Sequence, residues 1–112
     1  MFFANNGYEN ITPEDLRNKM QQGEDFLLLD VRTPAEHIGD AIEGSYLLPV
    51  QELASRAGEL PRSREIVVYC RVGNRSAFAA SYLARLGYKV KNLEGGILAW
   101  SLSQKGAFAM VS

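Results

Sequence analysis

The residue types best suited to chemistry gather around Cys70, the single cysteine among 112 residues. Cys70 follows a β-branched apolar segment, Ile66–Tyr69, and a helical pattern starts a few residues later with Ser76 as its predicted N-cap. The intervening loop contains Gly73, whose conformational freedom lets consecutive backbone N–H groups turn inward, as in an anion-binding nest. The N-terminus of the following helix adds positive potential at the same place.

Two arginines, Arg71 and Arg75, flank this loop and stay protonated at physiological pH. Together with the inward N–H groups they are predicted to stabilise a thiolate and to lower the pKa of Cys70 below the usual value of about 8.5. A lone cysteine is often no more than a small buried apolar residue. The convergence of glycine, arginines and a helix N-terminus favours a reactive thiolate, which is a nucleophile.

Helix and strand patterns alternate along the chain on both sides of this loop. Strands are predicted at 26–31, 41–48, 66–69 and 88–93, and helices at 12–20, 50–60, 77–86 and 97–102, with a turn or short helix from residue 33. Gly87 is predicted to end the third helix in a left-handed conformation. The alternation indicates an α/β fold with a small parallel sheet, in which ligands bind beyond the carboxyl ends of strands. Cys70 occupies such a position.

Three segments resemble a known family. Cys70–Ser76 reads C-R-V-G-N-R-S and resembles the active-site loop of single-domain rhodaneses, which often reads C-R-x-G-x-R-S. Leu29–Arg32 followed by Glu36 resembles the family's first signature, and Leu93–Ile97 resembles its closing segment. The family fold, a small parallel β-sheet with helices on both faces, agrees with the alternation described above.

This resemblance implies a sulfurtransferase in which Cys70 is the nucleophile and carries the transferred sulfur as a persulfide. The residues that it implies for substrate binding are Arg71, Val72, Gly73, Asn74, Arg75 and Ser76. The two arginines would attract a small anionic donor such as thiosulfate, and the acceptor would be cyanide or a thiol. A protein sulfur donor or acceptor is a further expected partner, and the reaction needs neither a cofactor nor a metal.

Asp30 and Arg32 end a predicted buried strand, where charged side chains are normally paired. We expect them to support the site through an ion pair with Glu36 that stabilises the following turn. A direct role in orienting the loop or a substrate is the alternative. His37 is too isolated in the sequence to be assigned as a general base.

Two other functions are compatible with a cysteine loop of this kind. Cysteine phosphatases and arsenate reductases also place a thiolate among backbone amides, but their loops read Cys-x5-Arg. Cys70 and Arg75 are separated by four residues. The resulting tighter cradle favours a single sulfur over a tetrahedral oxyanion. A non-catalytic or redox-regulated rhodanese-like binding module is the second alternative, and the presence of Cys70 with both arginines argues against it.

Composition excludes several function classes. Twelve basic and thirteen acidic residues give a net charge of -1, which provides no general attraction to nucleic acid or to an anionic membrane. One cysteine and one histidine cannot supply a structural zinc site. No stretch approaches the roughly 20 apolar residues of a membrane span, and the first residues lack a basic signal-peptide start. We therefore expect a cytoplasmic protein with a single domain over residues 1–112 and a core at about 8–102.

Overall fold

Five strands form one parallel sheet in the computed structural model, which describes residues 7–111 and the side chains of residues 7–104. The strands are β1 (Glu9–Ile11), β2 (Phe26–Asp30), β3 (Tyr46–Leu47), β4 (Glu65–Tyr69) and β5 (Val90–Leu93). Their order across the sheet is β1-β5-β4-β2-β3, and every neighbouring pair is parallel. Parallel neighbours require crossover connections, so the predicted α/β alternation is confirmed.

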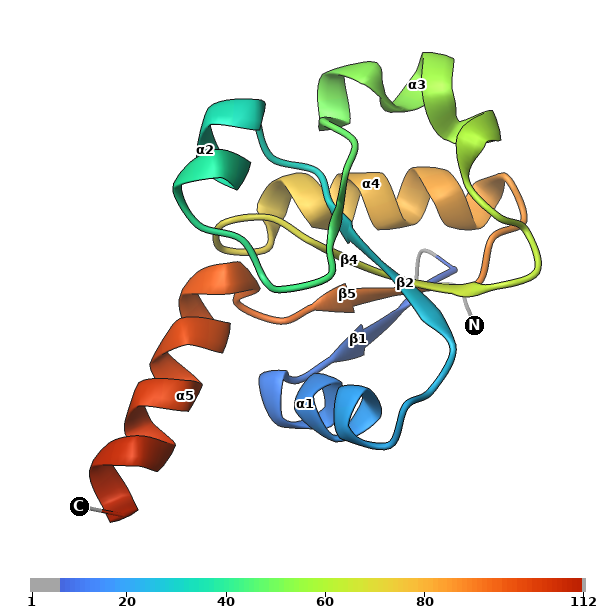
Figure 1. Ribbon diagram of the computed structural model, residues 1–112. Coiled ribbons are helices and arrows are strands. Elements are labelled where there is room, and N and C mark those ends of the chain that lie inside the picture. The colour runs from blue at the N-terminus through green and yellow to red at the C-terminus, as the bar shows by residue number, and fades with distance from the viewer. Residues whose placement is uncertain (1–6, 112) are drawn as a thin grey trace.

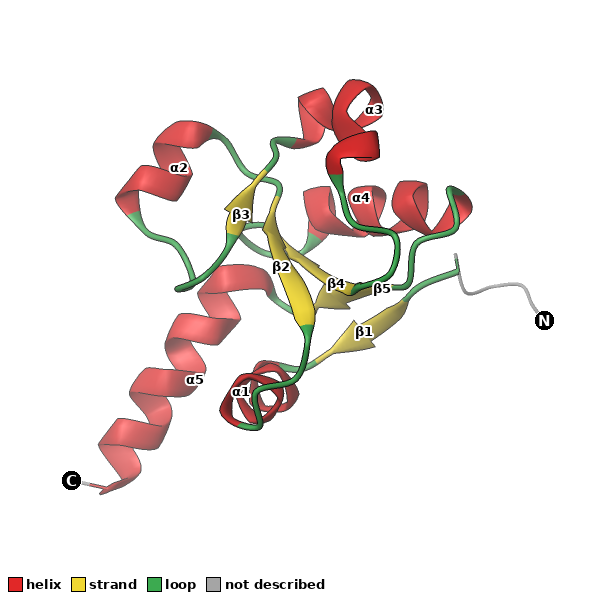
Figure 2. Ribbon diagram, turned by 45° about the vertical axis from the view of Figure 1, so that its right-hand side comes forward, coloured by secondary structure: helices red, strands yellow, loops and turns green. Residues whose placement is uncertain are grey.

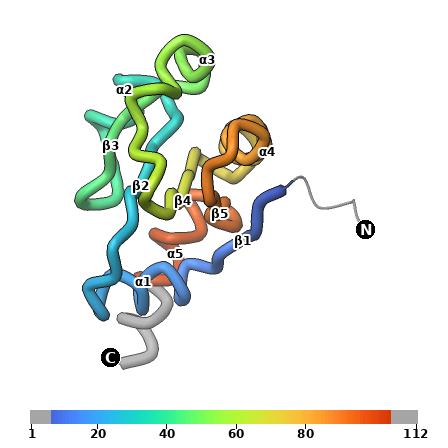
Figure 3. The backbone as a smooth tube through the Cα atoms, turned by 90° about the vertical axis from the view of Figure 1, so that its right-hand side faces the viewer, coloured from blue at the N-terminus to red at the C-terminus, as the bar shows by residue number. Residues whose placement is uncertain are grey.

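The helices cover both faces of the sheet. They are α1 (Pro13–Gln21), α2 (Pro34–Gly39), α3 (Leu53–Arg56), α4 (Asn74–Arg85) and α5 (Gly96–Val111), and short 3-10 turns at Val50–Glu52 and Ala57–Glu59 flank α3. Figure 1 shows α3 and α4 on one side of the sheet, with α1 and α5 on the other. The same layering is visible from the side in Figure 3.

Each face of the sheet has its own apolar core. Leu53 of α3 and Leu83 of α4 pack with Val68 of β4 on one face. Leu16 of α1 and Trp100 of α5 belong to the core on the opposite face. Because β2 and β4 are covered on both faces, their apolar runs are continuous rather than alternating, as the sequence indicated.

Local capping explains where the helices begin. The Thr12 hydroxyl accepts a hydrogen bond of 3.0 Å from the amide of Asp15, and Pro13 occupies the first helical position of α1, as predicted. Thr33 and Glu36 form a reciprocal capping box at the start of α2. Gly87 follows α4 with a φ of 98°, in the left-handed region predicted for it.

The structure differs from the sequence prediction in five elements. β1 was missed because it is three residues long, lies at the sheet edge and buries only Ile11. The helix predicted over 50–60 is broken into α3 and two 3-10 turns, and the strand predicted over 41–48 is limited to β3. α5 continues beyond residue 102 to Val111. Ser76 is not an N-cap, because α4 already begins at Asn74.

The sheet brings together two segments that are distant in the sequence. In the register of β2 with β4, Asp30 lies beside Tyr69, so the residues that follow the two strands leave the sheet next to each other. α2 therefore lies next to the loop that follows β4, and Figure 2 shows α2 beyond the ends of the central strands. The candidate site is assembled at this edge.

Candidate active site

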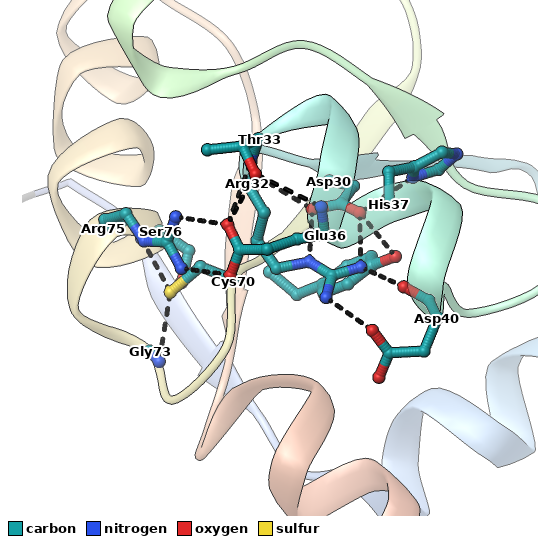
Figure 4. Close-up of polar contacts among 11 residues, drawn as sticks. Asp30, Arg32, Thr33, Glu36, His37, Asp40, Cys70, Gly73, Arg75 and Ser76 are labelled. Carbon is teal, nitrogen blue, oxygen red and sulfur yellow. Dashed lines mark hydrogen bonds and ion pairs between the residues drawn. The ribbon is translucent and has the colours of Figure 1, made fainter.

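The Cys70 side chain lies directly after β4 and is 1% exposed. Its sulfur accepts hydrogen bonds from the Gly73 amide at 3.1 Å, the Ser76 amide at 3.3 Å and the Ser76 hydroxyl at 3.3 Å (Figure 4). These donors come from the loop after β4 and from the first turn of α4. A sulfur surrounded by donors is arranged to carry negative charge.

The pKa of Cys70 results from two opposing effects. Burial raises it, whereas hydrogen bonds from the hydroxyl and amide of Ser76 and from the amides of Gly73 and Val72 lower it. The donors outweigh burial, so the pKa of the thiol lies below its ordinary value. The lowered pKa agrees with the sequence prediction. The groups that lower it most, however, are the uncharged amides and hydroxyl rather than the arginines.

The start of α4 explains why Ser76 can donate to the sulfur. Gly73 is the N-cap of α4 and has a φ of 113°, which few residues other than glycine adopt. The helix therefore begins three residues earlier than the predicted start after Ser76. Ser76 is fully buried within the first turn, where its amide has no intrahelical partner and both of its donors are free to face Cys70.

Arg75 does not point to an open ligand site. Its Nη1 and Nη2 donate to the two carboxylate oxygens of Glu36 at 2.8 and 2.9 Å. Glu36 also accepts a hydrogen bond of 3.0 Å from the Thr33 amide. The Arg75 guanidinium and the Thr33 amide hold the pKa of Glu36 at about 2. The pair ties the cysteine loop to α2 and compensates the charge of Arg75.

The prediction that Glu36 pairs with Asp30 and Arg32 is therefore wrong. Arg32 is buried and instead donates through Nε and Nη2 to the two oxygens of Asp30, at 2.9 and 2.8 Å, and through Nη1 to Asp40 at 3.0 Å. Burial raises the pKa of Asp30, whereas hydrogen bonds from Arg32 and His37 lower it. The hydrogen bonds have the larger combined effect, so the pKa lies below its ordinary value. Among the described residues, no hydrogen bond or ion pair joins this cluster to the cysteine loop.

His37 and Tyr69 belong to this buried cluster, although sequence reasoning assigned neither of them. His37 Nδ1 lies 2.8 Å from Asp30 Oδ2, and the Tyr69 hydroxyl donates to the same oxygen at 3.2 Å. The only signal available in the sequence was that Asp30 ends a buried strand and needs several partners. The cluster supports the end of β2, beside the loop.

The remaining loop residues face solvent. Arg71, Val72 and Asn74 are exposed, and Val72 retains 47% of its accessible surface. Within the described part of the chain, Arg71 forms no ion pair, in contrast to Arg75. The two arginines of the loop therefore differ: Arg75 is paired with Glu36, whereas Arg71, the residue that follows Cys70 in the sequence, is exposed and has no carboxylate partner among the described residues.

Comparison with known proteins agrees with this arrangement. The family model described as "Rhodanese-like domain" matches residues 12–103. A protein of Allochromatium vinosum named "Sulfurtransferase" is 44% identical over 92 residues, which cover 81% of this chain and 86% of that protein. The crystal structure of a rhodanese-related protein from Thermoplasma volcanium superposes with a TM-score of 0.80 and 35% identity, covering 86% of this chain and 93% of that one.

A similar sequence also occurs within a longer protein. The "Probable adenylyltransferase/sulfurtransferase MoeZ" of Mycobacterium tuberculosis is 38% identical over 94 residues. These residues represent 81% of this chain but 24% of that protein.

None of the helices in the described part of this chain has the length and hydrophobicity to cross a bilayer.

Proposed function

Because the chain belongs to the rhodanese-like domain family, we propose that it is a sulfurtransferase that moves a sulfane sulfur from a small anionic donor, such as thiosulfate, to cyanide or a thiol. The observation that carries this proposal is the buried Cys70 sulfur with three hydrogen-bond donors from the loop and α4. The name of the Allochromatium relative supports sulfur transfer in general.

The reaction consists of two displacements at sulfur. In the first, the Cys70 thiolate attacks the outer sulfur of thiosulfate, a new S–S bond forms, and sulfite leaves with the electron pair of the old bond. In the second, cyanide or a thiolate attacks the outer sulfur of the persulfide, and Cys70 departs as a thiolate. The Cys70 sulfur is negatively charged as the nucleophile of the first step and as the leaving group of the second. The donors around it therefore stabilise Cys70 in both of these states.

The compensated state of Arg75 argues against phosphatase or arsenate reductase chemistry. An oxyanion in such a site needs a guanidinium that can bind two of its oxygens. Here both terminal nitrogens of Arg75 already donate to Glu36. Together with the short spacing between Cys70 and Arg75, this favours transfer of a single sulfur.

The persulfide has one way to be discharged. Cys70 is the single cysteine of these 112 residues, so no second thiol of the chain can resolve it. The sulfur must pass to an external acceptor, a small nucleophile or a thiol of a protein partner. The proposed location is the cytoplasm, where thiols stay reduced.

Intact-mass measurement tests the proposal. Incubation with thiosulfate is expected to add about 32 Da, one sulfur atom, to the protein, and cyanide is expected to remove it. An adduct that cyanide releases as thiocyanate supports sulfur transfer. If the thiol is alkylated normally but no donor yields the adduct, the chain is a binding module instead.

A second prediction concerns capture of the donor. Arg71→Gln is expected to raise KM for thiosulfate about 5- to 10-fold with little change in kcat, because roughly 1 kcal/mol of attraction to the dianion is lost. The matched control is Arg64→Gln, which removes a guanidinium that is paired with Asp25 and lies away from the loop. Equal KM values for the two variants would contradict a role for Arg71 in donor binding.

A further inference from the structure

Three carbonyl groups of the cysteine loop bond to one segment, Asn92–Leu98, which joins the end of β5 to α5. The amide of Ile97 donates to the Cys70 carbonyl at 2.9 Å, and the amide of Leu98 donates to the Arg71 carbonyl at 3.1 Å. The Asn92 side chain donates to the Gly73 carbonyl at 3.5 Å, a long hydrogen bond, and the Ala77 amide of α4 donates to the same carbonyl at 3.1 Å. The amides of Ile97 and Leu98 belong to the first turn of α5, where no carbonyl of the helix itself is available to accept from them.

Peptide geometry links these outward carbonyls to the inward amides. In a trans peptide the C=O and the next N–H point in opposite directions, and no cis peptide occurs among the described residues. Holding the Cys70 and Arg71 carbonyls against α5 therefore turns the amides of Arg71 and Val72 away from α5, toward the interior of the loop. The Val72 amide is one of the donors that lower the pKa of the thiol.

The absence of a side chain at Gly96 allows the start of α5 to lie directly against the cysteine loop. The φ of Gly96 is 63°, and a Cβ at this position would lie 2.5 Å from the Cys70 carbonyl oxygen and would also clash with the Arg71 carbonyl. These atoms are backbone and cannot swing aside as a flexible side chain could. Glycine is therefore required for α5 to begin directly against the loop.

The burial of Asn92 is a second, independent indication that this segment holds the cysteine loop in place. The Asn92 side chain is 6% exposed, and its Oδ1 is buried without a hydrogen-bond partner. A buried unpaired amide oxygen is destabilising, and such groups are rare in folded proteins. A leucine of similar size would avoid this cost, so the value of Asn92 lies in the one hydrogen bond that its Nδ2 donates to the loop.

We propose that the segment Asn92–Leu98 positions the cysteine loop for sulfur transfer. α5 holds the Arg71 carbonyl outward, so that the Val72 amide of the same peptide faces the Cys70 sulfur. Asn92 holds Gly73, whose own amide donates to that sulfur. Asn92 and Gly96 are positioning residues, since neither touches the sulfur. The effect on transfer rests on the proposed function. The effect on the thiol does not, because it is measured without any sulfur donor.

The decisive variant is Asn92→Leu. It removes the side-chain donor to the Gly73 carbonyl, which keeps the Ala77 amide as a donor, and it also removes the unpaired oxygen. The thermal unfolding temperature is therefore expected to stay equal or rise. Thiolate ultraviolet absorbance, followed against pH, is expected to show a midpoint about half to one pH unit higher, and kcat for persulfide formation is expected to fall several-fold. Ser76→Ala, which removes a donor from the sulfur itself, serves as the positive reference.

Asn10→Leu is the matched control. Asn10 pairs with Asn92 in the β1–β5 register but is exposed and has no contact with the loop. It is expected to leave both the thiolate midpoint and kcat unchanged. Gly96→Ala is the second test variant, and it is expected to raise the midpoint further as the loop is pushed away from α5.

The outcomes separate the two proposals. A stable Asn92→Leu protein with the wild-type thiolate midpoint and wild-type kcat would overturn the positioning role, even if Gly96→Ala were unstable. A shifted midpoint in a protein that never forms a persulfide would support the positioning of the thiolate and reject sulfur transfer.

Discussion

Cys70→Ser is expected to eliminate the thiosulfate-dependent mass increase and to reduce sulfur transfer by at least about 1000-fold, the scale on which a lost nucleophile acts. A serine hydroxyl is not ionised near neutral pH and cannot form the S–S bond on which both displacements depend. Intact-mass measurement and thiocyanate release provide the two readouts. An adduct that persists in the variant would place the reactive group elsewhere in the chain.

The fold is expected to survive this substitution. The serine hydroxyl occupies less space than the thiol but meets the same donors from Gly73 and Ser76. The free energy of unfolding is therefore expected to change by only about 1 kcal/mol. Thermal unfolding and the far-ultraviolet spectrum check this. Loss of activity in a folded variant isolates the chemistry of the sulfur from the architecture around it.

Asp30→Ala is expected to lower the free energy of unfolding by about 3–5 kcal/mol, a large part of the stability of a domain of this size. Asp30 is fully buried and accepts hydrogen bonds from Arg32 through both carboxylate oxygens. Without it, Asp40, whose side chain is 64% exposed, is the one hydrogen-bond partner left to the buried Arg32 side chain among the described residues. Denaturant unfolding measures the loss, and Asp30→Asn, which retains one acceptor, is expected to lose less.

Asp25→Ala provides the comparison for a surface pair. Asp25 also bonds to an arginine, Arg64 at 3.0 Å, but its side chain is 79% exposed. Removing it is expected to cost at most about 1 kcal/mol, because water replaces the lost partner. Equal losses in the two variants would contradict the importance of burial at Asp30.

The pH dependence of the Asp30 effect has a definite sign. The pKa of Asp30 in the folded protein lies below 3.8, the value for an unperturbed group. Its contribution to stability is therefore complete above the unfolded pKa and is lost as pH falls through the folded one. The difference in unfolding free energy between wild type and Asp30→Ala is expected to be constant above about pH 5 and to shrink in more acidic solution.

The sequence predicted well those features that depend on neighbouring residues. The strand before Cys70, the caps of α1 and the left-handed Gly87 each follow from a few consecutive residue types. β1 could not be predicted in the same way, because its three residues acquire strand geometry from pairing with β5. The early start of α4 was missed because the serine after the loop is itself a typical cap, whereas the left-handed Gly73 fills that position.

Pairings across the sheet edge were the least predictable part of the site. Glu36 and Arg75 are 39 residues apart, and they meet only because β2 and β4 are neighbours in register. Arg32 was nearer to Glu36 in sequence, which favoured the wrong pair. The contact between α5 and the loop was not predicted either, although the glycine pair Gly95–Gly96 at the start of α5 was a sign of it in the sequence.

The nature of the donors around Cys70 has a consequence for the conditions under which the protein works. Cys70 is 1% exposed, so dissolved ions do not screen the interaction of its sulfur with the surrounding amides and hydroxyl. Arg71 is exposed, and dissolved ions do screen its charge. A rise in ionic strength is therefore expected to weaken the capture of the proposed anionic donor and to leave the acidity of the thiol nearly constant. The chain separates the encounter with its substrate, which depends on the medium, from the reactivity of its sulfur, which the fold itself protects.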